Sequence, residues 1–181
     1  MIVDPARDIR RWQLSPTGIA RMRAFAASPS AAAIATIRAS AETKAIEAAG
    51  LLAAARGLPV SVDAEFGEND RSATGFLPPT EFEATADRFF AAPETAVRGW
   101  ETAVAAQARV VAATARLLDA APATGDIAIV AHGAVGTLLW CHLAGLPIAR
   151  SHDQPFQGHF WRIDLPDRRP RHGWRPIAPR A

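Results

Sequence analysis

The sequence predicts an α/β fold built as a three-layer sandwich, with helices on both faces of a mostly parallel sheet. Short apolar runs of strand length alternate with longer stretches in which apolar residues recur every three or four positions, as in βαβ units. The run 127–131 is made only of alanine, isoleucine and valine, which is typical of a strand buried on both faces of a parallel sheet. At 181 residues, 49% of them apolar, the chain is long enough for one domain with a sizeable core.

The first half of the chain predicts two helices and two strands. Ser15 followed by Pro16 is a typical helix start, because serine caps the free amides and proline tolerates the first turn. Gly57 lies just past an alanine-rich helical pattern, where a glycine often ends a helix. The predicted elements are a helix at 16–27, a strand at 34–39, a helix at 42–56 and a strand at 58–63.

The second half begins with a long polar loop at 64–80, and loops of that length are often functional. An apolar stripe from Val97 to Leu118 predicts one long helix from just after Pro93 to about Ala121. The remaining predictions are a helix at 81–91, a strand at 127–131, a helix after Gly133 and a last strand at 158–165. We expect one domain over 1–165 and an Arg/Pro-rich tail over 166–181, either poorly ordered or strapped along the surface.

Composition narrows the class of protein. A net charge of only +2 argues against a dedicated nucleic-acid binder. Cys141 is the single cysteine, and no metal-ligand pattern is found, which fits a reducing cytoplasm and a site without metal or cofactor. The N-terminus has no signal pattern, and no apolar run reaches 18 residues. We therefore expect a cytoplasmic protein that does not bind a membrane, and the oligomeric state stays open.

His132 is the leading candidate for a functional residue. It follows a predicted buried strand at the edge where open α/β sheets place their ligands. The helix that begins at Gly133 would point its free amides at the same place, which suits an anion. The alternative is a buried histidine bonded to a backbone carbonyl. Of the other histidines, His142 either packs or is solvated on its helix, His159 is interpreted as structural, and His152 lies in a loop that could reach a substrate.

Four short segments carry a resemblance to a known family. They are Trp12-x-Leu14-Ser15-x-x-Gly18, Ser40-x-x-x-Lys44-Ala45, Phe66-Gly67-Glu68 and the His132-Gly133 strand end. Their order and spacing resemble the histidine phosphatase superfamily, also called phosphoglycerate mutase-like, over roughly residues 4–165. Sequence signatures of serine hydrolases, P-loop proteins, dinucleotide-binding folds and zinc proteases are absent.

The resemblance implies a role for three residues. His132 matches the family's second histidine, which contacts the phosphoryl group and stabilises its charge. Lys44 stands where the family usually has a phosphate-binding arginine, and a lysine supplies a point charge instead of a bidentate fork. Glu68 matches the acid that protonates the leaving oxygen, a step that an alkoxide needs near neutral pH. Glu65 and Asp70 are neighbouring carboxylates that could take this role instead.

The chain departs from the family at its beginning. The family's attacking histidine ends the first strand, and this sequence has no histidine before His132. We therefore expect that Met1 is a misassigned or truncated start, that the first strand is largely missing, and that the chain as written is nearly inactive. Arg7, Arg10 and Arg11 could line an anionic pocket near this end or be solvated surface residues.

Three functions remain open on the sequence. The leading one is hydrolysis of a small phosphomonoester through a phosphohistidine in the full-length protein. The second is a non-catalytic member of the same fold that binds a phosphorylated ligand or partner. The third is an unrelated α/β domain in which His132 is structural.

Overall fold

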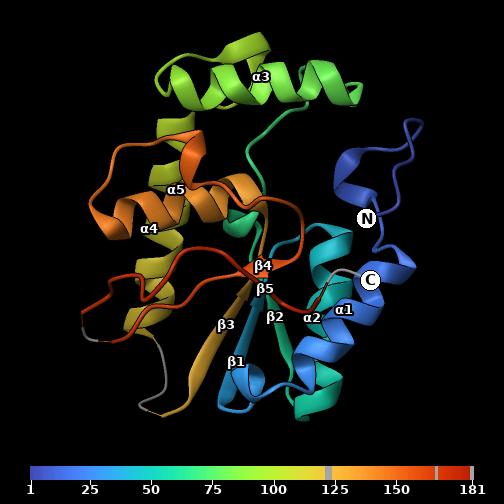
Figure 1. The fold of residues 1–181 in the computed structure, drawn as a ribbon, viewed down its shortest axis with the longest axis vertical. Helices are drawn as coiled ribbons and strands as arrows, with labels where there is room; N and C mark the ends of the chain where they lie inside the picture. Colours follow the sequence, from blue (N-terminus) through green and yellow to red (C-terminus); the bar gives the residue numbers. More distant parts are fainter. Residues whose placement is uncertain (121–123, 166, 180–181) are drawn as a thin grey trace.

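The computed structural model describes residues 1–120, 124–165 and 167–179. At its centre lies a parallel sheet of β1 (Ile34–Ala39), β2 (Val60–Val62) and β3 (Asp126–Val130), in the order β2-β1-β3 (Figure 1). Ala39 pairs with both Val62 and Val130, so the carboxyl ends of all three strands meet at one edge. The α/β prediction and strand 34–39 are confirmed.

Helices cover both faces of the sheet (Figure 1). On one face α1 (Pro16–Ala26) and α2 (Thr43–Arg56) pack together, and on the other lie α4 (Ala103–Asp119) and α5 (Gly133–Ala144). The side chains of β3 alternate between them: Ile127 and Ile129 join the apolar cluster of α4 and α5, whereas Ala128 and Val130 join that of α1 and α2. The predicted three layers are therefore present. The remaining helix, α3 (Pro79–Ala91), lies beyond α4 and α5, away from the sheet (Figure 1).

Helix ends follow the local signals in the sequence. Ser15 Oγ accepts the N–H of Gly18 at 3.1 Å and caps α1, as its position predicts. Gly57 ends α2 with φ of +64°, a left-handed conformation in which glycine is favoured.

The prediction of one long helix after Pro93 is wrong. The chain forms a short 3₁₀ turn at Val97–Gly99, where Arg98 and Gly99 both have positive φ, and α4 begins only at Ala103. Thr102 Oγ1 accepts the N–H of Ala105 at 3.1 Å and sets that start. The apolar stripe misled because Trp100 is buried from an extended segment, not from a helix. Ala121, the predicted end, lies outside the described residues.

β3 is less buried than predicted. All five of its residues are only partly buried. Within the described chain β3 is an edge strand of the parallel sheet and pairs with β1 alone. The predicted last strand at 158–165 is also mostly wrong. Only β4 (His159–Phe160) is a strand, and it pairs antiparallel with β5 (Arg175–Pro176) in a separate sheet of two strands.

The segment after α5 lies across the surface of α5 and α1. Trp174 packs on Gly136 and donates from Nε1 to the carbonyl of His152 at 3.0 Å. Arg21 of α1 donates to the carbonyls of Gln157 at 2.7 Å and Gly158 at 2.9 Å. Within the described part of the predicted tail, residues 167–179, Trp174 and the Arg175–Pro176 strand bond to earlier parts of the chain, which fits the surface-strapped alternative.

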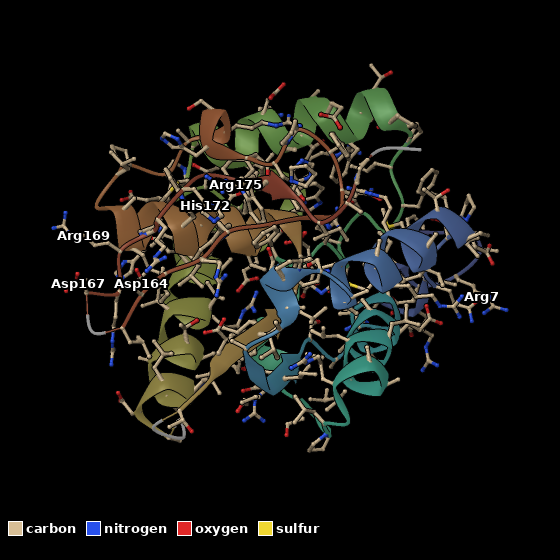
Figure 2. The ribbon with its side chains drawn as sticks, turned by 60° about the horizontal axis from the view of Figure 1, so that its bottom comes forward. Arg7, Asp164, Asp167, Arg169, His172 and Arg175 are labelled. Carbon is tan, nitrogen blue, oxygen red and sulfur yellow. The ribbon has the colours of Figure 1, made fainter. Side chains whose placement is uncertain are left out.

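Three arginines of the C-terminal part of this segment pair with carboxylates. The pairs are Arg162 with Asp126, Arg168 with Asp119 and Arg171 with Asp164. Figure 2 shows Arg169, Asp164 and Asp167 at the opposite end of the molecule from Arg7. Among the described residues, no helix is both long and apolar enough to cross a membrane.

Candidate functional site

The site lies at the carboxyl edge of β1 and β3. Ser40 directly follows β1 and extends the ladder, its N–H donating to the carbonyl of Val130 at 3.0 Å. His132 follows β3 two residues after its end, and its Nε2 lies 2.8 Å from Ser40 Oγ. Ser40 is fully buried, and the His132 side chain is 5% exposed. The sheet thus joins two of the sequence segments that carry the resemblance.

Glu42 is the residue around which this site is built, and sequence reasoning missed it. It precedes α2 and is buried. Its Oε1 lies 3.2 Å from His132 Nε2 and accepts the backbone N–H of Glu68 at 2.9 Å, while its Oε2 pairs with Lys44 Nζ. The one signal in the sequence is a carboxylate that stands between Ser40 and Lys44, directly after a strand.

Lys44 comes from the first turn of α2 and is largely covered. Its Nζ bonds to Glu42 and donates to the carbonyl of Ile9 at 3.2 Å. The side chain is 13% exposed. The structure therefore brings Lys44 to the same carboxylate that His132 contacts.

The carboxylate of Glu68 lies at the N-terminus of α5. Its Oε1 accepts the N–H of Val135 at 3.1 Å, and Oε2 accepts that of Ala134 at 3.4 Å. The sequence predicted that these amides would hold an anion. In this structure the anion that they hold is the protein's own Glu68.

Arg109 fixes the loop that carries Glu68, and it too was not singled out from the sequence. From α4 it donates to the carbonyls of Glu65 at 2.7 Å and Gly67 at 3.1 Å, and it pairs with Glu101 at 2.8 Å. Its side chain is partly buried. A basic residue on the core-facing side of a long helix is the signal that could have identified it.

The other carboxylates and arginines that were candidates lie on the surface and are not among the side chains that bond to His132. Glu65 and Asp70 are exposed. Arg7 pairs with Asp4 at 3.2 Å and Arg10 with Asp8 at 2.7 Å, and their side chains are 62% and 69% exposed. Arg11 is also exposed. These arginines are surface residues in this structure.

His152 does not reach the site, but its loop does. The ring of His152 packs against Trp140, with 5.1 Å between ring centroids. Two residues on, the side-chain amide of Gln154 lies so close to Gly133 that a Cβ there would be 2.4 Å from Nε2. Asp153 ties the loop to α5, since Thr137 Oγ1 donates to its Oδ1 at 2.8 Å. Gln154 therefore covers the glycine next to His132.

Burial and charge set the protonation of this cluster. Burial lowers the pKa of His132, although the nearby Glu68 and Glu42 carboxylates oppose the shift. Burial would raise the pKa of Glu42, but His132, Lys44 and the N–H of Glu68 together lower it. Above its lowered pKa, His132 is neutral and contributes to Glu42 as a hydrogen-bond donor, while Lys44 supplies a positive charge. Because an ionised carboxylate only accepts, His132 carries its hydrogen on Nε2.

Within the described part of the chain, no three His, Cys, Asp or Glu side chains are grouped so that they could hold a metal ion. The groups that face one another are one lysine, one histidine, one serine and two glutamates. Such a set can bind an oxyanion through Lys44 and His132 and can hold or release a proton at a carboxyl group.

The model of the histidine phosphatase superfamily (branch 1) matches residues 6–165. The chain belongs to this superfamily. No curated protein sequence matches it significantly. This superfamily member is nevertheless similar in fold to several solved structures, all of them below 25% sequence identity, so that these likenesses speak for the fold alone.

Three of these structures illustrate the likeness. A mycobacterial glucosyl-3-phosphoglycerate phosphatase is 21% identical with a TM-score of 0.77, over 93% of this chain and 90% of that one. The same phosphatase with inorganic phosphate is 23% identical with a TM-score of 0.64, over 79% and 77%. YhfR of Bacillus stearothermophilus is 18% identical with a TM-score of 0.73, over 95% and 86%.

Proposed function

We propose that the protein is a phosphatase that hydrolyses a small phosphomonoester, with Lys44 and His132 binding the phosphoryl group. The observation that carries the proposal is the convergence of Ser40, Lys44, Glu68 and His132 at one sheet edge. These residues come from segments up to 92 positions apart in sequence. Membership of the histidine phosphatase superfamily supports the same reaction class.

In the proposed reaction a histidine attacks phosphorus in line, and the bond to the leaving oxygen breaks. Lys44 Nζ and His132 Nε2–H hold the equatorial oxygens, whose negative charge they stabilise. Glu68 gives a proton to the leaving oxygen. Water then attacks the phosphohistidine, releasing phosphate and freeing the histidine. The family resemblance implies an attacking histidine at the end of a first strand, and the 181 residues contain no histidine before His132 that could take this role.

Glu68 has to change its bonding to act as this acid. Both of its oxygens accept backbone N–H bonds from the first turn of α5. A protonated carboxyl keeps acceptor capacity on its second oxygen, so one of these bonds can persist while the other oxygen carries the proton. The proposal therefore includes a shift of the Glu68 side chain towards the substrate.

A comparison of two proteins tests the proposal. One is the 181-residue chain, and the other carries an added N-terminal strand that ends in a histidine, as the family resemblance implies. On a generic aryl phosphate we expect turnover by the extended protein, nearly none by the short one, and an acid-labile phosphohistidine trapped only in the former. Zero turnover by both would remove the enzyme claim.

A non-catalytic binder of a phosphorylated ligand is the second candidate. One observation favours it: among the described residues, the side chains bonded to His132 are Ser40 and Glu42, and neither can replace an attacking histidine. Thermal stabilisation by phosphate or vanadate without turnover would support this function. A trapped phosphohistidine would exclude it.

A further inference from the structure

Glu42 uses the same hydrogen-bond donors that the proposed reaction assigns to the phosphoryl group. Its two oxygens bond to Lys44 Nζ, to His132 Nε2 at 3.2 Å and to the N–H of Glu68 at 2.9 Å. It is a compact anion that accepts from a lysine, a histidine and a backbone amide, as an oxyanion ligand would. The carboxylate is also buried, at 7% side-chain exposure, so it is not a solvated surface group that happens to lie near.

We propose that Glu42 is a built-in competitor of phosphate: its carboxylate occupies the donors that would bind phosphate, and a phosphoryl group binds only by displacing it. This inference rests on the proposed function, since it assigns Lys44 and His132 to the phosphoryl group. Glu42 is then a positioning residue, because it acts through Lys44 and His132 and does not touch the reacting atoms.

The charges of the cluster show why displacement is needed. Among the described residues, Lys44 carries the one positive charge that contacts Glu42. His132 in its uncharged form adds only a donor, and the positive charge of Arg71 acts on His132. Glu68 is a second carboxylate, and it accepts hydrogen bonds from the α5 amides that follow His132. A phosphoryl group that entered beside both carboxylates would meet repulsion in a buried, poorly screened place. When Glu42 moves out, Lys44 and His132 Nε2–H become available to it.

The geometry of the chain permits such a movement. Glu42 lies before the first turn of α2, and its backbone N–H donates to Ser40 Oγ at 3.2 Å, so its backbone stays anchored while the side chain rotates. Lys44 keeps a second partner, the carbonyl of Ile9 at 3.2 Å. Displacement therefore breaks side-chain bonds without unwinding the helix.

The variant E42Q tests the inference by calorimetric titration of inorganic phosphate into the 181-residue chain at pH 7. Glutamine keeps the size and can still accept from the Glu68 N–H, but it lacks the charge and presents an amide N–H₂ to Lys44. We expect phosphate to bind at least about tenfold more tightly than to the wild type.

E47Q is the matched control. Glu47 lies on the same helix, accepts the N–H of Leu14 at 2.7 Å and takes no part in the site. The substitution removes one negative charge from the chain, as E42Q does, so it corrects for net charge. We expect wild-type affinity from it. The double variant E42Q/K44M should lose the gain, because the gain acts through the released lysine.

The outcomes separate this inference from the proposed function. Tighter binding by E42Q than by E47Q, including binding by E42Q where the wild type shows none, supports it. Equal or weaker binding by folded E42Q, judged by its circular dichroism and melting temperature, overturns it and leaves the phosphate site standing. E42A carries the same expectation should E42Q fail to fold. Absence of phosphate binding by every variant overturns both the site and the inference.

Discussion

Helix α5 serves two regions of the molecule that are stabilised in different ways. Its first turn belongs to the site, where the amides of Ala134 and Val135 hold the Glu68 carboxylate. Its middle is a platform for the C-terminal segment, where the indole of Trp174 lies on Gly136. The site is held by buried charges and hydrogen bonds, whereas the C-terminal segment, where it lies on α5, is held by aromatic contacts and indole N–H bonds.

Because of this difference, the two parts of α5 should respond differently to substitution. Buried charges that satisfy one another are costly to break singly and are available to an ionic ligand. Aromatic contacts contribute to stability in proportion to the area they bury and offer nothing to phosphate. Substitutions in the site should therefore change both stability and phosphate binding, whereas those under the C-terminal segment should change stability alone.

The largest effect is expected for K44M. It leaves the Glu42 carboxylate buried without its cation, and breaking a buried pair in this way costs about 3 kcal/mol. Phosphate binding should also disappear. Denaturant unfolding measures the loss, and E42Q/K44M is the control, since removing both charges should restore most of it. A K44M protein as stable as the wild type would show that the pair contributes nothing.

The next largest effect is expected for W174A, in the other region. The substitution removes a half-buried indole from α5 and the bond from Nε1 to the His152 carbonyl, at a cost of about 2 kcal/mol. W174F keeps an aromatic ring and should lose less. Both variants should bind phosphate as the wild type does. Weaker phosphate binding by W174A would join the two regions that the comparison separates.

Local signals in the sequence suffice for most of the fold. Ser15 and Gly57 mark helix ends through bonds and backbone conformations that depend on a few neighbouring residues, so their elements were predicted within one or two residues. The predicted strand at 158–165 was mostly wrong because a strand needs a pairing partner that local sequence does not reveal. Only His159–Phe160 forms a strand there, and its partner is Arg175–Pro176. The predicted long helix after Pro93 was wrong for a similar reason. Val97 and Trp100 are buried from a turn and an extended residue, and their spacing imitates the apolar stripe of a helix.

The site shows the same limit. His132, Lys44 and Glu68 could be named from the resemblance, because motif spacing survives without coordinates. Glu42 could not, because an acidic residue before a helix is ordinarily a solvated cap. Its role depends on three groups that meet only after β1 and β3 pair.

Acid should act on the site through His132. Burial lowers its pKa below the ordinary value of 6.5, so the unfolded chain binds more protons and stability falls as the pH drops below about 6.5. Glu42, whose pKa is lowered, adds a further loss below its ordinary value of 4.5. H132Q should flatten the first part of this decline by about 1 kcal/mol, as measured by urea unfolding from pH 7.5 to 5. His159, with a pKa also lowered by burial, provides H159Q as a comparison, and an unchanged slope in H132Q would contradict the assignment.

The smallest effects are expected from two glycines on α5. A Cβ on Gly136 would lie 2.7 Å from the rigid ring of Trp174, whereas one on Gly133 would meet the movable amide end of Gln154 at 2.4 Å. G136A should therefore destabilise the protein by about 1 kcal/mol despite the better helix propensity of alanine, and G133A should stay within about 0.5 kcal/mol.

For phosphate binding we expect the opposite order, with a larger effect of G133A than of G136A. G133A displaces the Gln154 amide from Gly133, the residue next to His132, so it should alter the affinity for phosphate, while G136A should leave that affinity unchanged. Urea unfolding and phosphate titration of both variants measure the two effects. A G136A protein that is stable but binds phosphate poorly would mean that the first turn of α5 and its middle are not independent, because only a shift of the whole helix could carry the strain from Trp174 to His132.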